Sequence, residues 1–213
     1  EMCIRDSPKR FKAVTNLCDW PHADPYLVPE VYEVIENNDV IFVPNGSSEL
    51  CLAFQQAKKQ KRKKIKIVSV TSEAHPLSYN AVFEGKINKR SVADKLDVCR
   101  TGKAHKKTIA LADKETYFVT VPRTYIYAGN GLYNGEVRQE NPQTHASLTS
   151  GICEGALLYA LDNNRRFPCS YRFEYLNPFA DKRGIDIWEK FPVERELTLE
   201  KGEKICIVNT GGK

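Results

Sequence analysis

Four short apolar runs predict the strands of a buried sheet. They cover residues 40–43, 65–70, 116–121 and 205–208, and polar or turn-forming residues bound each of them. Continuous apolar runs of this length are typical of parallel strands that helices cover on both faces. The pattern predicts an α/β fold with a parallel-centred open sheet, in which residues 40–43 lie beside residues 65–70 and residues 205–208 join the same sheet.

Apolar positions at helical spacing follow the first of these runs. Leu50, Ala53, Phe54 and Ala57 predict a helix over residues 49–59, directly before the strand at residues 65–70. A strand, a helix and a strand joined by short loops form a βαβ unit, which implies parallel strands and a right-handed crossover. Further helices are expected over residues 26–35, from Pro76 to about residue 83, and over residues 143–161.

Two later segments differ from this pattern. The predicted helix at residues 143–161 is rich in Gly, Ala and Ser, which allows a neighbouring element to approach closely. Residues 163–202 mix proline, aromatic and charged residues and predict no ordered set of elements.

The composition is that of a soluble globular protein. The chain has 213 residues, of which 41% are hydrophobic and 28% are charged, enough for one large or two small domains. Its apolar runs are far shorter than the roughly 20 residues of a membrane-spanning helix, so no membrane partner is expected. The seven cysteines include no Cys-x-x-Cys pair and several lie in apolar runs, which favours reduced thiols and a cytoplasmic location.

The positive charge of the chain is concentrated in one segment. The formal net charge is +5, and seven cationic residues fall between positions 58 and 66, so the remainder of the chain carries −2. A nucleic-acid patch and a solvated helix end are both consistent with such a run. Because no aromatic residue interrupts it, and because cations complement a helix C-terminus, we favour the helix end and expect no nucleic-acid partner.

The loop between the first predicted strand and its helix is the main candidate site. It reads Pro-Asn-Gly-Ser-Ser at residues 44–48. A loop of Gly and Ser at the start of a helix directs several backbone N–H groups to one point, which suits a phosphate group. The alternative is that Ser47 or Ser48 only caps the helix. Neither the P-loop signature nor the dinucleotide-binding signature is present, and the histidines and cysteines show no metal-ligand spacing, so no metal is expected.

The order of several segments resembles a known enzyme family. The segments are V-I-F-V-P-N-G-S-S-E-L at residues 40–50, I-K-I-V-S-V-T-S-E-A-H-P-L at residues 65–77, S-V-A-D-K-L-D-V at residues 91–98, the small-residue helix, and I-C-I-V-N-T-G-G at residues 205–212. In this order they resemble the C-terminal two thirds of fold type II pyridoxal-phosphate-dependent enzymes, in particular the threonine synthase and cysteine synthase-like β family. The resemblance implies the tryptophan synthase β-like fold and pyridoxal 5'-phosphate as cofactor.

Site residues follow from the resemblance by position. It places Asn45, Gly46, Ser47, Ser48 and Glu49 at the cofactor, with the loop around its phosphate, and Thr210 at its pyridine nitrogen. A neutral hydroxyl there leaves the ring unprotonated, which favours β- or γ-elimination and replacement on an amino-acid substrate. Glu49 departs from the usual glycine-rich loop, and its carboxylate must point away from the phosphate for the site to work. The family is commonly dimeric, so a homodimer is also implied.

The resemblance further implies that the chain is a C-terminal fragment. Residues 1–7 look like a translated sequencing adapter, so we exclude them from the fold and expect residues 8–213 to form the cofactor-binding domain of a longer protein. The Schiff-base lysine of the family lies well upstream of the phosphate loop, where this chain has only Lys9 and Lys12. We therefore expect that lysine to be missing and the chain alone to be inactive. A non-catalytic α/β module that binds a phosphorylated small molecule or nucleotide, or a degenerate family member, remains the alternative.

Overall fold

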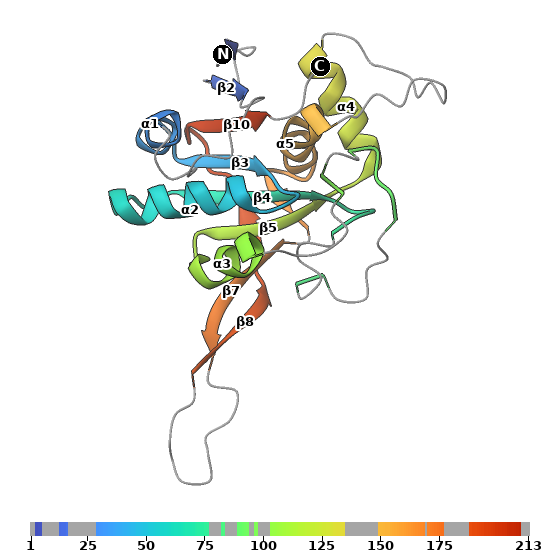
Figure 1. The fold of residues 1–213 in the computed structure, drawn as a ribbon. Coiled ribbons are helices and arrows are strands. Elements are labelled where there is room, and N and C mark those ends of the chain that lie inside the picture. The colour runs from blue at the N-terminus through green and yellow to red at the C-terminus, as the bar shows by residue number, and fades with distance from the viewer. Residues whose placement is uncertain are drawn as a thin grey trace.

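The structure of the protein is a computed structural model. It describes residues 3–5, 13–16, 29–76, 82–83, 89–93, 96–97, 103–134, 149–168, 170–176 and 188–209. Eight strands form the main sheet, and the expected α/β architecture is confirmed (Figure 1).

The strands of the main sheet are ordered β1-β2-β10-β3-β4-β5-β7-β8. Their bounds are β1 (Cys3–Arg5), β2 (Ala13–Asn16), β3 (Val40–Pro44), β4 (Lys66–Ser72), β5 (Thr116–Val121), β7 (Ser170–Leu176), β8 (Glu189–Glu194) and β10 (Ile205–Asn209). The five strands from β2 to β5 in this order are parallel, whereas β1, β7 and β8 pair antiparallel at the two edges. The predicted neighbours are confirmed, because β3 pairs with β4 on one side and with β10 on the other.

Helices cover both faces of this sheet, as the apolar strands predicted. The helices α1 (Pro29–Asn37), α2 (Glu49–Lys61) and α3 (Lys103–Leu111) lie on one face, and α4 (Arg123–Asn134) and α5 (Ile152–Asp162) lie on the other (Figure 1). Alternate residues of β3 show the division: Ile41 and Val43 pack with α1 and α2, while Val40 and Phe42 pack with α5. No helix in the described part of the chain has the length and apolar character that a membrane crossing requires.

Some elements were not predicted. The sequence pattern indicated neither α3 nor α4, and the segment 163–202 contains the antiparallel β7–β8 pair together with a second small sheet of β6 (Arg166–Phe167) and β9 (Leu197–Thr198). The helix expected at residues 143–161 is described only from α5 onward, after a 3₁₀ turn at Thr149–Gly151. The helix expected at residues 76–83 and the start of the helix expected at residues 26–35 fall mainly outside the described residues.

The small residues of α5 do allow a close approach, and the partner is α4. A Cβ atom added at Gly155 would lie 2.3 Å from the Tyr125 carbonyl oxygen of α4, and one added at Gly129 would lie 2.1 Å from the Gly151 carbonyl oxygen. No side chain fits at these distances, so the two helices meet backbone to backbone. This contact fixes α5 over the centre of the sheet.

The basic segment after α2 is only partly the solvated helix end that we predicted. Lys59, Lys61, Arg62 and Lys64 are exposed. Lys58 is 6% exposed, and its Nζ lies 2.8 Å from Asp113 Oδ2. Lys66 is also paired, with its Nζ 2.7 Å from Glu203 Oε1. The segment therefore contributes to the tertiary structure as well as to the charge of the surface.

Candidate functional site at the carboxyl edge of the sheet

The predicted site lies where β3 ends at the carboxyl edge of the parallel strands, the edge at which ligands bind in open α/β sheets. The loop is held to the neighbouring strand by Asn45. Its backbone N–H donates to the Val70 carbonyl oxygen at 2.8 Å, and its side-chain Nδ2 donates to Ser69 Oγ at 2.8 Å. Asn45 is buried, so in this structure it anchors the loop to β4.

Gly46 brings the loop against a second segment of the chain. A Cβ atom added there would lie 3.0 Å from both the Cα and the carbonyl oxygen of Leu96. Leu96 belongs to the S-V-A-D-K-L-D-V segment, whose described residues include a hydrogen bond from the Leu96 N–H to the Ala93 carbonyl oxygen at 2.9 Å. This segment borders the loop, and a larger residue at position 46 would separate the two backbones.

Ser48 occupies the N-cap position of α2 but does not cap the helix with its side chain. Its backbone is left-handed, with φ 71° and ψ 0°, and its hydroxyl makes no capping hydrogen bond. Its Oγ lies 3.4 Å from His105 Nδ1, and its carbonyl oxygen accepts a hydrogen bond from the Leu52 N–H at 2.9 Å. The alternative role of Ser48 as a side-chain cap is therefore not realised, and its hydroxyl does not compete for the first N–H groups of α2.

The α3 helix contacts this loop through His105 and Thr108, which both lie against Ser48. Thr108 Oγ1 donates to the Ser48 carbonyl oxygen at 3.2 Å, and His105 is 8% exposed. Burial lowers the pKa of His105 below its ordinary value, so the imidazole is neutral at neutral pH. The positive field at the loop therefore comes from the α2 dipole and the backbone N–H groups rather than from His105.

The other two loop residues, Ser47 and Glu49, are exposed. Glu49 is the first residue of α2, where a carboxylate interacts favourably with the helix dipole. The expectation that its carboxylate points away from a phosphate at the loop stays a prediction.

The last predicted residue, Thr210, lies outside the described residues. The strand that leads to it is described: β10 runs parallel to β3, with Ile207 opposite Phe42. Asn209 and Pro44 each follow two residues later, so β10 and β3 end at the same edge of the sheet. The chain thus leaves β10 on the side of the sheet where the Gly46 loop lies.

A buried acid at this edge was missed by the sequence analysis. Glu154, in the first turn of α5, is 5% exposed, and its Oε1 accepts a hydrogen bond from Asn209 Nδ2 at 2.9 Å. Within the described part of the chain, Glu154 Oε2 and Asn209 Oδ1 have no hydrogen-bond partner. Burial raises the pKa of Glu154 from its ordinary value of 4.5 to about 8, so the carboxyl is mostly protonated at neutral pH.

The sequence did contain a signal for this acid. Glu154 is the single charged residue of the α5 sequence Ile-Cys-Glu-Gly-Ala-Leu-Leu-Tyr-Ala-Leu that precedes Asp162. Burying a lone acid on an otherwise apolar helix costs free energy unless the acid finds a hydrogen-bond partner. The partner, Asn209, could be recognised only from the folded structure. One buried oxygen atom on each of these two residues is without a hydrogen-bond partner among the described residues, which is unusual for a buried polar group.

Comparisons with known proteins agree with the fold. No protein-family model matches the sequence, and no curated protein is similar to it. Solved structures are similar in fold. Threonine deaminase isoform 2 from Solanum lycopersicum has a TM-score of 0.54 at 14% identity, over 86% of this chain and 43% of that chain.

Two racemases give comparable values. The serine racemase of Dictyostelium discoideum has a TM-score of 0.52 at 17% identity, and a pyridoxal 5'-phosphate-dependent aspartate racemase has a TM-score of 0.52 at 14% identity. Each match covers 86% of this chain and 46% of the other. The chain spans somewhat less than half the length of these solved structures, and it has the fold of the fold type II pyridoxal-phosphate-dependent enzymes.

Proposed function

We propose that this chain is the cofactor-binding part of a pyridoxal-phosphate-dependent lyase or synthase of fold type II that acts on an amino acid. The reaction class is β- or γ-elimination or replacement, of the threonine synthase type. The observation that carries the proposal is the uncapped, left-handed N-terminus of α2 at Ser48, which shares one edge of the sheet with the buried Glu154–Asn209 pair.

The loop fits the phosphate end of the cofactor. The N–H groups at the start of α2 are not used by a side-chain cap, and they lie at the positive end of the helix dipole. Gly46 lets the loop pack directly against Leu96, and the exposed Ser47 hydroxyl adds a donor. Asn45 holds the loop in place through its side-chain hydrogen bond to Ser69.

Glu154 and Asn209 fit the opposite, ring end. A charged carboxylate beside a pyridine nitrogen would favour the protonated ring, whereas a Glu154 pKa of about 8 keeps this side chain mostly neutral at neutral pH. A neutral surrounding agrees with the neutral Thr210 hydroxyl that the resemblance assigns to the same nitrogen. Asn209 precedes Thr210 directly, so the hydrogen bond to Glu154 also fixes the strand end from which Thr210 follows.

Bound pyridoxal phosphate supplies the electron sink for bond cleavage next to the amino group of the substrate. The residues of this chain bind the phosphate, orient the ring and hold the proton on Glu154. We propose that the Schiff-base lysine comes from a part of the protein outside this chain, and that the whole protein is a homodimer. The thiols of Cys51, Cys153 and Cys206 are buried, and we propose a reducing, cytoplasmic setting for the protein.

Cofactor binding by the purified chain tests this proposal. The quenching of intrinsic fluorescence should report weak binding of pyridoxal phosphate and much weaker binding of pyridoxal, because the loop recognises the phosphate. Gly46→Val should abolish the preference for the phosphorylated form, since the new side chain meets the Leu96 backbone. Gly202→Ala is the control, because nothing lies within 4 Å of a Cβ atom at Gly202 and only the local φ of 90° adds strain there. Gly202 lies in the turn before β10, at the end of that strand away from the loop.

Equal affinity for pyridoxal and its phosphate would contradict the assignment of the loop, as would unchanged binding in Gly46→Val. Borohydride reduction followed by mass analysis tests the missing lysine. A stoichiometric lysine adduct formed by this chain would show that one of its own lysines serves, and the lysine would then not need to come from elsewhere.

A further inference from the structure

A second polar site lies at the opposite edge of the sheet. A groove of about 710 Å³ is bounded by the C-terminal ends of α2 and α3, the start of β5, and the middle and loop end of the β7–β8 strand pair. The α2 helix has 13 residues, so its two ends are about 20 Å apart. The groove is therefore separate from the loop at the N-terminus of α2.

The groove is strongly basic. Seven cationic and two anionic side chains line it, which leaves a surplus of five positive charges. This surplus equals the formal net charge of the whole chain, +5, so the charges elsewhere balance. Such a concentration in a concave surface attracts anions.

The two acids are already paired with cations of the same groove. Lys58 Nζ lies 2.8 Å from Asp113 Oδ2, and Arg172 Nε lies 2.6 Å from Glu174 Oε1. Lys190 Nζ donates to the carbonyl oxygen atoms of Ile109 and Ala110 at 2.8 Å each, which offsets the negative end of α3. These contacts neutralise the groups that would otherwise repel an anion.

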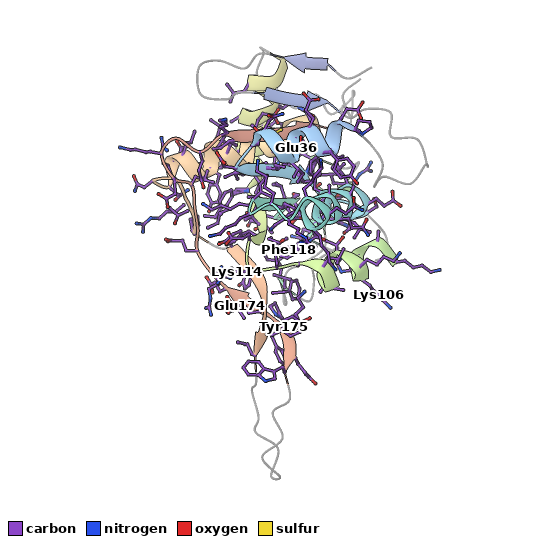
Figure 2. All side chains as sticks on the ribbon, turned by 90° about the vertical axis from the view of Figure 1, so that its left-hand side faces the viewer. Glu36, Lys106, Lys114, Phe118, Glu174 and Tyr175 are labelled. Atoms are coloured by element: carbon purple, nitrogen blue, oxygen red, sulfur yellow. The ribbon has the colours of Figure 1, made fainter. Side chains whose placement is uncertain are left out.

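Three further cations of the groove are not paired. Within the described part of the chain, the side chains of Lys59, Arg62 and Lys114 have no ion-pair or hydrogen-bond partner. Lys114 and Glu174 of β7 line the same groove, whereas Lys106 of α3 points to the other side of the molecule in Figure 2. Three like charges around one groove repel one another unless an anion lies between them.

Arg62 occupies a position that usually belongs to glycine. It is the C-cap of α2 with φ 50°, in the left-handed region, and its N–H bonds the carbonyl oxygen atoms of Lys58 and Lys59. A residue with a side chain is less stable there than glycine. A role for the guanidinium in the groove would account for it.

The groove also contains a buried amide without partners. Gln55 lines the groove and is 3% exposed, and among the described residues neither its Nε2 nor its Oε1 has a hydrogen-bond partner. Burying an unpaired amide is costly, and a ligand that offers both a donor and an acceptor group, or bridges through water, would relieve that cost. The unpaired Gln55 amide is a second observation, separate from the surface charges, that indicates a ligand site in this groove.

We propose that this groove is a binding site for a small polyanion that carries phosphate groups. A volume of about 710 Å³ lies in the range of small-molecule sites. Each phosphate group offers up to two charges and several strong acceptor oxygen atoms, which suits two lysines and one arginine placed around a small volume. The concave shape and the small number of unpaired cations favour a compact ligand over a nucleic-acid strand, which needs an extended basic track.

Calorimetric titration of the purified chain with sodium tripolyphosphate, at constant ionic strength in chloride buffer, tests the site. Lys114→Gln should lower the affinity about tenfold, because a charged contact to phosphate is lost. Lys106→Gln is the matched control, since Lys106 is also an exposed lysine associated with α3 but does not line the groove, and it should change the affinity less than about twofold.

Gln55→Met separates binding from stability. It should weaken tripolyphosphate binding, yet leave the thermal unfolding midpoint unchanged or higher because an unpaired buried amide is removed. If this variant does not fold, Lys59→Gln takes its place, and circular dichroism checks the fold of each variant.

Several outcomes would overturn the proposal. They are absence of tripolyphosphate binding by the folded chain, equal losses in Lys106→Gln and Lys114→Gln, and unchanged affinity in Gln55→Met. Equal binding of citrate would refute the assignment to phosphate groups. Binding of a single-stranded oligonucleotide alone would assign the surface to nucleic acid instead. Tripolyphosphate that binds at the Gly46 loop would be insensitive to Lys114→Gln, so the two sites are distinguishable.

Discussion

Replacing Glu154 by Gln should remove a pH-dependent loss of stability. In the folded protein burial raises the pKa of Glu154 from 4.5 to about 8. Between these two values the folded state binds more protons than the unfolded state, so the free energy of unfolding falls as the pH rises. Glutamine has the same shape, still accepts the hydrogen bond from Asn209 and does not titrate, so Glu154→Gln should lack this loss.

The size of the effect follows from the shift. One unit of pKa corresponds to roughly 1.4 kcal/mol, so full ionisation of Glu154 costs about 5 kcal/mol relative to the protonated side chain. From about pH 5.5 to about pH 8.5 the unfolding free energy of the natural chain should fall by about 3 kcal/mol relative to that of Glu154→Gln. The whole stability of a domain is only about 5–15 kcal/mol, so the difference is large enough to measure.

Urea unfolding of both proteins at the two pH values provides the measurement. His105, which lies on a different helix, is present in both proteins, so its contribution cancels in the comparison. Burial raises the pKa of the neighbouring Cys153 thiol, so this thiol stays protonated in the folded protein over the same pH range. Parallel pH dependence of the two proteins would refute the argument, because it would show that Glu154 is not a buried acid with a raised pKa.

Three further predictions concern the packing. Gly155→Ala should destabilise the fold by about 3 kcal/mol, since its Cβ atom would lie 2.3 Å from a backbone oxygen atom of α4, whereas Gly202→Ala should cost only about 1 kcal/mol, from its φ of 90°; equal effects on thermal unfolding would contradict this. Asp113→Ala should lower the free energy of urea unfolding by about 2 kcal/mol, because it leaves the buried Lys58 without its partner. Lys58→Met should lower it by less, because the Asp113 side chain is 49% exposed and can be solvated. The reverse order of the two variants would be evidence against the pairing. Ser48→Gly should be more stable than Ser48→Ala by about 1 kcal/mol in the same assay, because both Ser and Ala are strained at φ 71°, and equal stability would show that position 48 is not left-handed.

The sequence alone determined the parallel core and the main candidate loop. The apolar runs of β3, β4, β5 and β10 are local signals of strands buried on both faces, and the abrupt change to helical spacing after Pro44 fixes the β3–α2 corner. Signals of this kind depend on neighbouring residues only, so they survive without any knowledge of the fold. The order of these segments along the chain was sufficient to indicate the fold type.

Elements whose buried faces are polar escaped this reasoning. The buried residues of α3 are His105 and Thr108, which a search for apolar periodicity does not detect. The strand β7 is a different case, because Tyr171, Phe173 and Tyr175 alternate with polar residues, and that period-two pattern could have predicted it.

Tertiary structure alone decided which distant polar groups meet. Glu154 and Asn209 are 55 positions apart, and their hydrogen bond exists because α5 is pressed onto the sheet by its glycine contact with α4. The basic groove likewise joins α2, α3 and the β7–β8 hairpin, so Gln55 becomes a buried amide only when all three are assembled. A polar group loses its hydrogen bonds to water when it is buried, and this loss costs free energy. Whether a group is buried depends on the folded chain and not on the residues next to it in the sequence.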